Sequence, residues 1–165
     1  MSRLLDAFEP TVSPDYRTFG LVDTSADTHT PNADFSRWLV SAPGMVRLQV
    51  PSQVVRASLR LESWSTAPST GPAPWSGQAE ADVELPTADL GIEVSADGMR
   101  EIPLILPSPG TYRTRWHWIF NPGNGPYASP LTGSSAALET PLGHAEELKG
   151  EDQDCLVQMW RVARR

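Results

Sequence analysis

The sequence predicts an all-β protein, an antiparallel β-sandwich of jelly-roll type, with a closed β-barrel as the alternative. Several short segments alternate between apolar and polar residues, as strands with one buried face do. The chain also has 16 Pro and 12 Gly among its 165 residues, which favours short strands joined by turns over long helices. We expect one domain over residues 1–165, with 1–15 as a partly ordered N-terminal segment.

The first half of the chain contains the expected strands in order. Leu4, Leu5 and Phe8 share one helical face, so the N-terminal segment is consistent with a single helical turn before Pro10. The first strand is expected over 16–23, and two more lie within 35–51, on either side of a turn at 42–44. Residues 52–64 alternate most clearly and predict a strand with one face on the core and one in water.

The acidic strand comes next, after a Pro- and Ser-rich loop over 65–77. Residues 78–86 alternate small or apolar residues with Glu80, Asp82 and Glu84, so we interpret the acidic side as a solvated strand face. Two further strands within 90–107 meet at Asp97-Gly98, a favoured hairpin turn. Pro103 restricts the second of them to an edge strand or a bulge.

The segment "GTYRTRWHWIF", residues 110–120, carries the strongest alternation. Trp116 and Trp118 lie on an aromatic side that we expect to pack in the core. The other side presents Arg113, Arg115 and His117 as a cationic ladder. We expect the acidic strand 78–86 to neutralise this ladder, because like charges across strands repel one another. An external acidic partner or ligand, and a catalytic His117, are the alternatives.

The last expected strand is "CLVQMWRV", residues 155–162, which is apolar on both sides and therefore predicted to be central. Cys155 is interpreted as a packed core residue, because free cysteines are usually buried. Residues 121–133 are expected to form a Gly- and Pro-rich loop, and 134–154 allow one or two helical turns that Pro141 and Gly143 interrupt.

No motif for catalysis or cofactor binding is recognisable. The single cysteine excludes an internal disulfide and a CxxC site, and the three histidines are far apart in the sequence. The chain has no GxSxG nucleophile motif and no glycine-rich phosphate loop. We therefore expect no cofactor, no metal site and no catalytic residues, and we favour a non-enzymatic protein.

The net charge of the chain limits the kinds of partner that we expect it to bind. A net charge of −7 disfavours nucleic acid as a partner, because phosphate backbones are repelled. No apolar run is long enough for a membrane span, and the N-terminus lacks the apolar region of a secretory signal. We expect a cytoplasmic protein without membrane contact. Lys149 is the only lysine, a bias towards arginine that is typical of GC-rich bacterial genomes.

Two segments carry a resemblance to known proteins. "PSPGTYRTRWHW" and "EDQDCLVQMWRV" resemble the closing strands of small, mostly uncharacterised actinobacterial β-rich proteins. These are in turn distantly similar to the competence nuclease-inhibitor family, which are β-sandwich binders. The matching residues are Gly110, Tyr112, Arg113, Arg115, Leu156, Val157, Gln158 and Trp160. The resemblance covers the last third of the chain and implies a binding protein of sandwich fold.

These observations favour a protein-binding module, in the manner of an immunity or inhibitor protein for a basic nuclease or toxin. The candidate contact residues are acidic groups with two aromatic anchors: Trp75, Glu80, Asp82, Glu84, Tyr127, Glu146, Glu147, Glu151 and Asp152. The first alternative is a small-molecule-binding protein or biosynthetic enzyme with an aromatic pocket lined by Arg113, Arg115, Trp116, His117 and Trp118. The second is a structural or assembly subunit, and a homo-oligomer is compatible with each.

Overall fold

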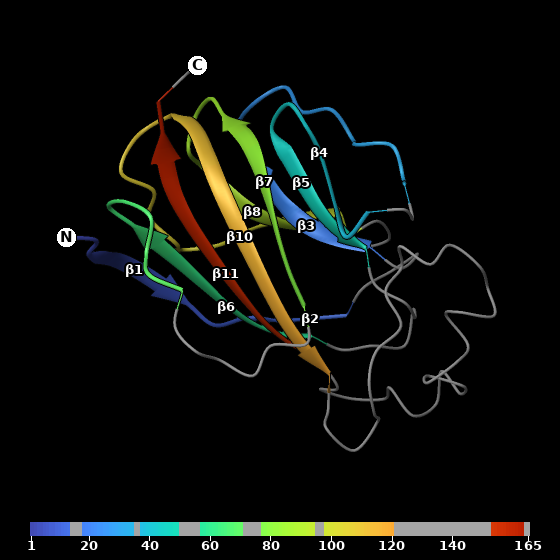
Figure 1. Ribbon diagram of the computed structural model, residues 1–165. Helices are drawn as coiled ribbons and strands as arrows, with labels where there is room; N and C mark the ends of the chain where they lie inside the picture. The colour runs from blue at the N-terminus through green and yellow to red at the C-terminus, as the bar shows by residue number, and fades with distance from the viewer. Residues whose placement is uncertain are drawn as a thin grey trace.

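Two β-sheets face each other in the computed structural model, which describes residues 1–13, 18–34, 37–49, 57–70, 77–94, 98–120 and 153–163 (Figure 1). Sheet A has the strand order β1-β6-β11-β10-β7, and β2 also pairs with β6; sheet B has the order β4-β5-β3-β8-β9. The strands are β1 (Leu4–Phe8), β2 (Thr11–Val12), β3 (Thr18–Asp23), β4 (Leu39–Ala42), β5 (Met45–Gln49), β6 (Ala57–Trp64), β7 (Gly77–Leu85), β8 (Leu90–Val94), β9 (Gly98–Glu101), β10 (Gly110–Phe120) and β11 (Gln153–Val162).

The β-sandwich prediction is confirmed. All regular elements in the described residues are strands, and they divide into two sheets with separate end strands rather than one closed barrel. No part of the chain that the structure describes forms a helix long and apolar enough to cross a membrane. The hydrophobic core lies between the sheets, where Phe19 of β3 meets Trp116 of β10 with ring centroids 6.0 Å apart.

One strand pair runs against the sequence-based expectation. The strands were expected to be antiparallel throughout, but β11 pairs with β6 in parallel. The reason is positional: β11 is antiparallel to β10 along ten register pairs, from Thr111–Val162 to Phe120–Gln153. Its direction is thereby fixed, and its other neighbour, β6, runs the same way. The expected central position of β11 is confirmed, with Cys155 buried.

The N-terminal segment also differs from its local pattern. Residues 4–8, expected as a helical turn, form strand β1 on the edge of sheet A, where Leu4 pairs with Trp64 and Phe8 with Leu61. Five residues are too few for a stable helix, whereas the edge of β6 offers a ladder of backbone hydrogen bonds. A register shift falls between Leu4 and Asp6. The Asp6 carboxylate accepts a hydrogen bond of 2.8 Å from the backbone amide of Ile105.

The predicted turn at 42–44 is confirmed. Gly44, with φ of 78°, closes the β4–β5 hairpin, and its amide donates to the Glu84 carbonyl at 3.0 Å, which ties sheet B to the β7 edge of sheet A. Gly98, with φ of 74°, begins β9 and pairs with Val94 of β8, whereas Asp97 of the predicted turn lies outside the described residues. Strand β9 ends at Glu101, before Pro103, and is the edge of sheet B as expected.

Candidate functional site

The outward surface of sheet A gathers six of the fourteen candidate residues that the sequence singles out: Glu80, Asp82, Glu84, Arg113, Arg115 and His117. We call this surface the outer face; it faces away from the core and spans β7, β10, β11 and β6. Register partners on neighbouring strands project from the same side. The outer face therefore comprises Gln78, Glu80, Asp82, Glu84, Thr111, Arg113, Arg115, His117, Leu156, Gln158, Trp160, Ser58, Arg60, Glu62 and Trp64.

Arginines of β10 pair with carboxylates of β7 across this face. Arg113 lies opposite Asp82 and donates from Nε at 2.8 Å and from Nη2 at 3.1 Å to its two oxygens. Arg115 lies opposite Glu80 and donates from Nε at 2.7 Å. The expectation that the acidic strand neutralises the cationic ladder is confirmed for Arg113 and Arg115, whereas His117 lies opposite Gln78. These contacts hold Arg113 charged, and the Asp82 hydrogen bond raises its pKa.

Arg115 has two further contacts that fix its position. Its Nη1 donates to the Pro68 carbonyl at 3.0 Å, and its guanidinium carbon lies 4.8 Å from the centre of the Trp160 ring. Pro68 is itself buried, so the segment after β6 folds back across the outer face. A guanidinium held over an indole face gains cation–π attraction in addition to its ion pair.

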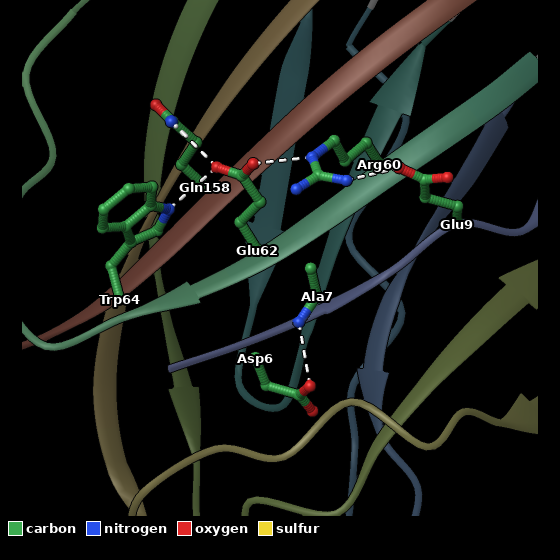
Figure 2. A network of polar contacts seen from close by, with 7 residues as sticks. All are labelled: Asp6, Ala7, Glu9, Arg60, Glu62, Trp64 and Gln158. Carbon is green, nitrogen blue, oxygen red and sulfur yellow. Dashed lines mark hydrogen bonds and ion pairs between the residues drawn. The ribbon is translucent and has the colours of Figure 1, made fainter. Parts of the chain in front are cut away.

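A second network centres on the Glu62 carboxylate (Figure 2). It accepts hydrogen bonds from Arg60 Nε at 2.7 Å, from Trp64 Nε1 at 2.8 Å and from Gln158 Nε2 at 3.1 Å. Arg60 also contacts Glu9. Burial alone would raise the pKa of Glu62, but the hydrogen bonds from Arg60, Gln158 and Trp64 outweigh it, so the pKa lies below its ordinary value of 4.5. Glu62 is therefore an anion at neutral pH.

The charge state of His117 is determined by its burial and by its charged neighbours. His117 is buried, and this burial lowers its pKa below the ordinary value of 6.5; the neighbouring Arg115 lowers it further. Gln158, Glu80 and Glu62 oppose the shift without overcoming it. The imidazole is therefore neutral at pH 7.

The aromatic residues of the proposed ligand pocket lie on the other side of β10. Trp116 and Trp118 are buried in the core, where Trp116 Nε1 donates to Thr114 Oγ1 at 3.0 Å. The centroid of the Trp118 ring lies 4.3 Å from the centroid of the Trp38 ring. The sheet itself thus separates these indoles from Arg113, Arg115 and His117, and the five residues do not line one shared cavity.

Six of the predicted contact residues fall outside the described residues: Trp75, Tyr127, Glu146, Glu147, Glu151 and Asp152. The ends of the segment that holds five of them are placed, because Phe120 and Gln153 are register partners. The segment therefore leaves and rejoins sheet A at the same point. Residues 121–152 contain five carboxylates and one lysine, a net charge of −4 within the chain's −7.

Sequence reasoning missed the Glu62 network and two clefts. The alternation of 155–162 separated Gln158 and Trp160 from the core residues, but only the parallel pairing of β11 with β6 brings them beside Glu62 and Trp64. One cleft of about 550 Å³ lies between the β7–β8 turn and residues 101–109. Another of about 550 Å³ lies where β10 begins and β11 ends. In the described part of the chain, no three metal-ligating side chains come together.

Two solved structures share this fold. ComJ from Bacillus subtilis, described as an inhibitor of the DNA degrading activity of NucA, aligns over 98% of this chain and 99% of its own, with a TM-score of 0.59 and 12% identity. The product of crocagin biosynthetic gene J aligns over 99% of both chains, with a TM-score of 0.51 and 15% identity. No protein-family profile and no curated sequence matches the chain. The expected distant similarity to a nuclease inhibitor is thus supported at the level of the fold.

Proposed function

We propose that this chain is a protein-binding module that inhibits a basic nuclease or toxin by stoichiometric association. The observation that carries the proposal is the likeness to ComJ, a nuclease inhibitor, over almost the whole length of both chains. The fold is shared, while the sequences have diverged to 12% identity, so the partner of this chain need not resemble NucA. A bacterial, cytoplasmic setting accompanies the proposal.

The distribution of charge supports an acidic contact surface. The negative charges of Glu80 and Asp82 are already balanced by Arg115 and Arg113 on the outer face. These two carboxylates therefore contribute little to the electrostatic field that a partner would meet. The excess of negative charge resides in residues 121–152, which include Glu146, Glu147, Glu151 and Asp152. We propose that these carboxylates steer a basic partner and that Trp75 and Tyr127 anchor it, since electrostatic complementarity raises association rates and buried aromatics dominate interface energies.

The proposal is tested with the partner itself. The chain is immobilised and exposed to lysate of its source organism, and each retained basic protein is then expressed and assayed for DNA degradation with increasing amounts of the chain. We expect inhibition that saturates near one chain per nuclease and weakens as salt rises. Retention of no protein, or a retained nuclease whose DNA degradation is unchanged, contradicts the proposal.

A charge-matched pair of variants locates the contact. The triple variant Glu146→Gln, Glu147→Gln, Glu151→Gln is compared with Asp27→Asn, Asp89→Asn, Glu101→Gln, which removes the same charge from exposed positions on the described surface. We expect the first variant to slow association and the second to leave the rate nearly unchanged, because steering depends on charge near the contact. Equal slowing by both variants would assign the effect to net charge alone.

A second candidate function is a role in small-molecule biosynthesis. It is favoured by the likeness to the product of crocagin biosynthetic gene J, a full-length match to a biosynthesis protein. Native mass spectrometry of the protein purified from its source organism distinguishes the two. A bound small molecule supports this candidate, whereas a stoichiometric second protein supports the inhibitor.

A further inference from the structure

The cleft at the upper end of sheet A has the lining of a binding site. It lies where β10 begins and β11 ends, and Leu5 of β1 also lines it. Figure 1 shows the beginning of β10 and the end of β11 side by side at the top of sheet A. Its volume of about 550 Å³ falls in the range of small-molecule sites, which is about 300–1,000 Å³. It is lined by Leu5, Ser65, Pro107, Ser108, Gly110, Thr111, Arg161, Val162 and Ala163.

Arg161 supplies the single charge among these lining residues. Its side chain lies across Gly110, where an added Cβ atom would come within 2.6 Å of the guanidinium Nε. The absence of a side chain at Gly110 thus makes room for the guanidinium at the wall of the cleft. On the same sheet Arg60, Arg113 and Arg115 each form an ion pair, whereas no carboxylate of the described residues lies within ion-pair distance of Arg161.

The other polar groups of the cleft are hydroxyls. Ser65 Oγ accepts a hydrogen bond of 2.9 Å from the backbone amide of Arg3. The hydroxyl proton of Ser65 therefore remains available to donate to a ligand. Ser108 and Thr111 add two further hydroxyls to the lining. No carboxylate lines this cleft, in contrast with the cleft beside β9, which Asp89 and Glu101 line. The polar groups therefore favour an anion.

The chemistry of the anion follows from the remaining walls. Leu5, Pro107, Val162 and Ala163 are apolar, so the cleft suits a ligand with an apolar body as well as a charged head. One guanidinium fork matches the two oxygens of a carboxylate. We propose that this cleft binds the carboxylate of an organic molecule with a short apolar body, either a free carboxylic acid or the C-terminal carboxylate of a peptide.

This site is distinct from the proposed inhibitory contact. Residues 121–152 leave sheet A at Phe120 and return at Gln153, at the opposite end of β10 and β11 from Gly110 and Val162. A variant that no longer binds carboxylates should therefore still inhibit the nuclease. If no inhibited nuclease is found, the proposed carboxylate site is unaffected. Each proposal fails or holds on its own measurement.

The test is a titration of the ¹⁵N-labelled protein followed by NMR. The probes are octanoate, the peptide Ala-Leu-Ile-Val with a free carboxyl terminus, the same peptide amidated, and inorganic phosphate. We expect saturable shifts at the amides of Ser65, Thr111 and Ala163 with octanoate, the free peptide or both, and none with the amidated peptide. Response to octanoate alone assigns a small-molecule source, and response to the free peptide alone assigns a peptide source.

Matched arginine variants make the test decisive. Arg161→Gln is expected to weaken binding of the responding probe by about tenfold or more, since charge-assisted hydrogen bonds are the strong ones. Arg100→Gln is the control, because Arg100 is an exposed arginine of β9 that does not line the cleft. Shifts with phosphate only, equal response to the amidated peptide, or equal loss in both variants would overturn the proposal.

Discussion

Two arginine–carboxylate pairs of the same geometry occupy very different surroundings in the two sheets. In sheet B, Arg47 donates to Glu93 from Nε at 3.0 Å and from Nη2 at 2.6 Å. In sheet A, Arg113 and Asp82 form a similar two-bond pair. The side chains of the sheet B pair are 13% and 9% exposed, whereas those of the sheet A pair are 38% and 45% exposed.

The difference arises from what lies between the partners. Arg113 and Asp82 are on adjacent strands and face each other directly. Arg47 and Glu93 flank the central strand β3, where both are register partners of Gly20. The missing side chain at Gly20 lets the pair close over the strand. Burial makes each partner of such a pair depend on the other, while solvent screens the exposed pair.

Removal of one buried partner is expected to have the largest effect. Arg47→Met leaves the Glu93 carboxylate buried without its cation, so the free energy of unfolding should fall by about 3 kcal/mol, as for other broken buried pairs. Urea denaturation measures the change. The double variant Arg47→Met, Glu93→Leu is the control and should recover most of the loss. A double variant as unstable as Arg47→Met would show that the loss comes from packing rather than from the stranded charge.

Gly20→Ala should be the next most damaging change. The added Cβ would collide with the Val46 carbonyl and the Arg47 side chain, and overpacking of this kind costs about 1–3 kcal/mol. Part of that cost comes through the displaced Arg47. The loss should therefore be smaller when Gly20→Ala is added to Arg47→Met, measured by the same denaturation. Fully additive losses would separate Gly20 from the ion pair.

Acidification should weaken the protein in two stages. The pKa of His117 is lowered on folding, so the unfolded state takes up a proton first and stability falls as pH drops below the ordinary value of 6.5. The pKa of Glu62 is also lowered, so its stabilisation is present above 4.5 and is lost as pH falls through its folded pKa. Urea midpoints from about pH 8 to about pH 2 record both stages.

Two variants assign these stages. His117→Gln should remove the dependence that begins below 6.5, and Glu62→Gln should remove the dependence below 4.5. Each variant is compared by the shape of its pH profile rather than by its baseline stability. A His117→Gln profile identical to that of the unchanged protein would place the upper stage on another group.

Asp82→Asn should have the smallest effect. The pair with Arg113 is exposed, so its loss should lower the free energy of unfolding by about 0.2–1 kcal/mol and by less in high salt. A double-mutant cycle with Arg113→Gln measures the coupling directly. Coupling as large as that between Arg47 and Glu93 would contradict the argument from burial.

The sequence predicted the parts of the site that depend on alternation alone. The period of two on residues 110–120 placed Arg113 and Arg115 together on one side and Trp116 and Trp118 on the other, and the structure has them so. The complementary charges of 78–86 predicted which strand lies beside them. Both inferences use only the geometry of a strand and the repulsion of like charges.

The Glu62 network could not be predicted from alternation and charge in the same way. Glu62 and Gln158 are 96 residues apart, and nothing local to either strand indicates that they run in parallel. The N-terminal segment shows the same limit, because Leu4, Leu5 and Phe8 fit a helical turn until the edge of β6 is present to pair with them. Long-range pairing overrides a weak local pattern.

By itself the sequence determined the class of fold, the faces of the strands and the sign of the net charge, because each follows from residue type and periodicity within a short segment. Apart from the acidic strand beside residues 110–120, the tertiary structure alone decided which strands are neighbours. That choice placed Arg47 and Glu93 across Gly20, set Trp160 beside Trp64, and brought Leu5, Ser65 and Arg161 to one cleft. These residues meet only because packing of two sheets joins strands that are distant along the chain, and no local preference encodes that proximity.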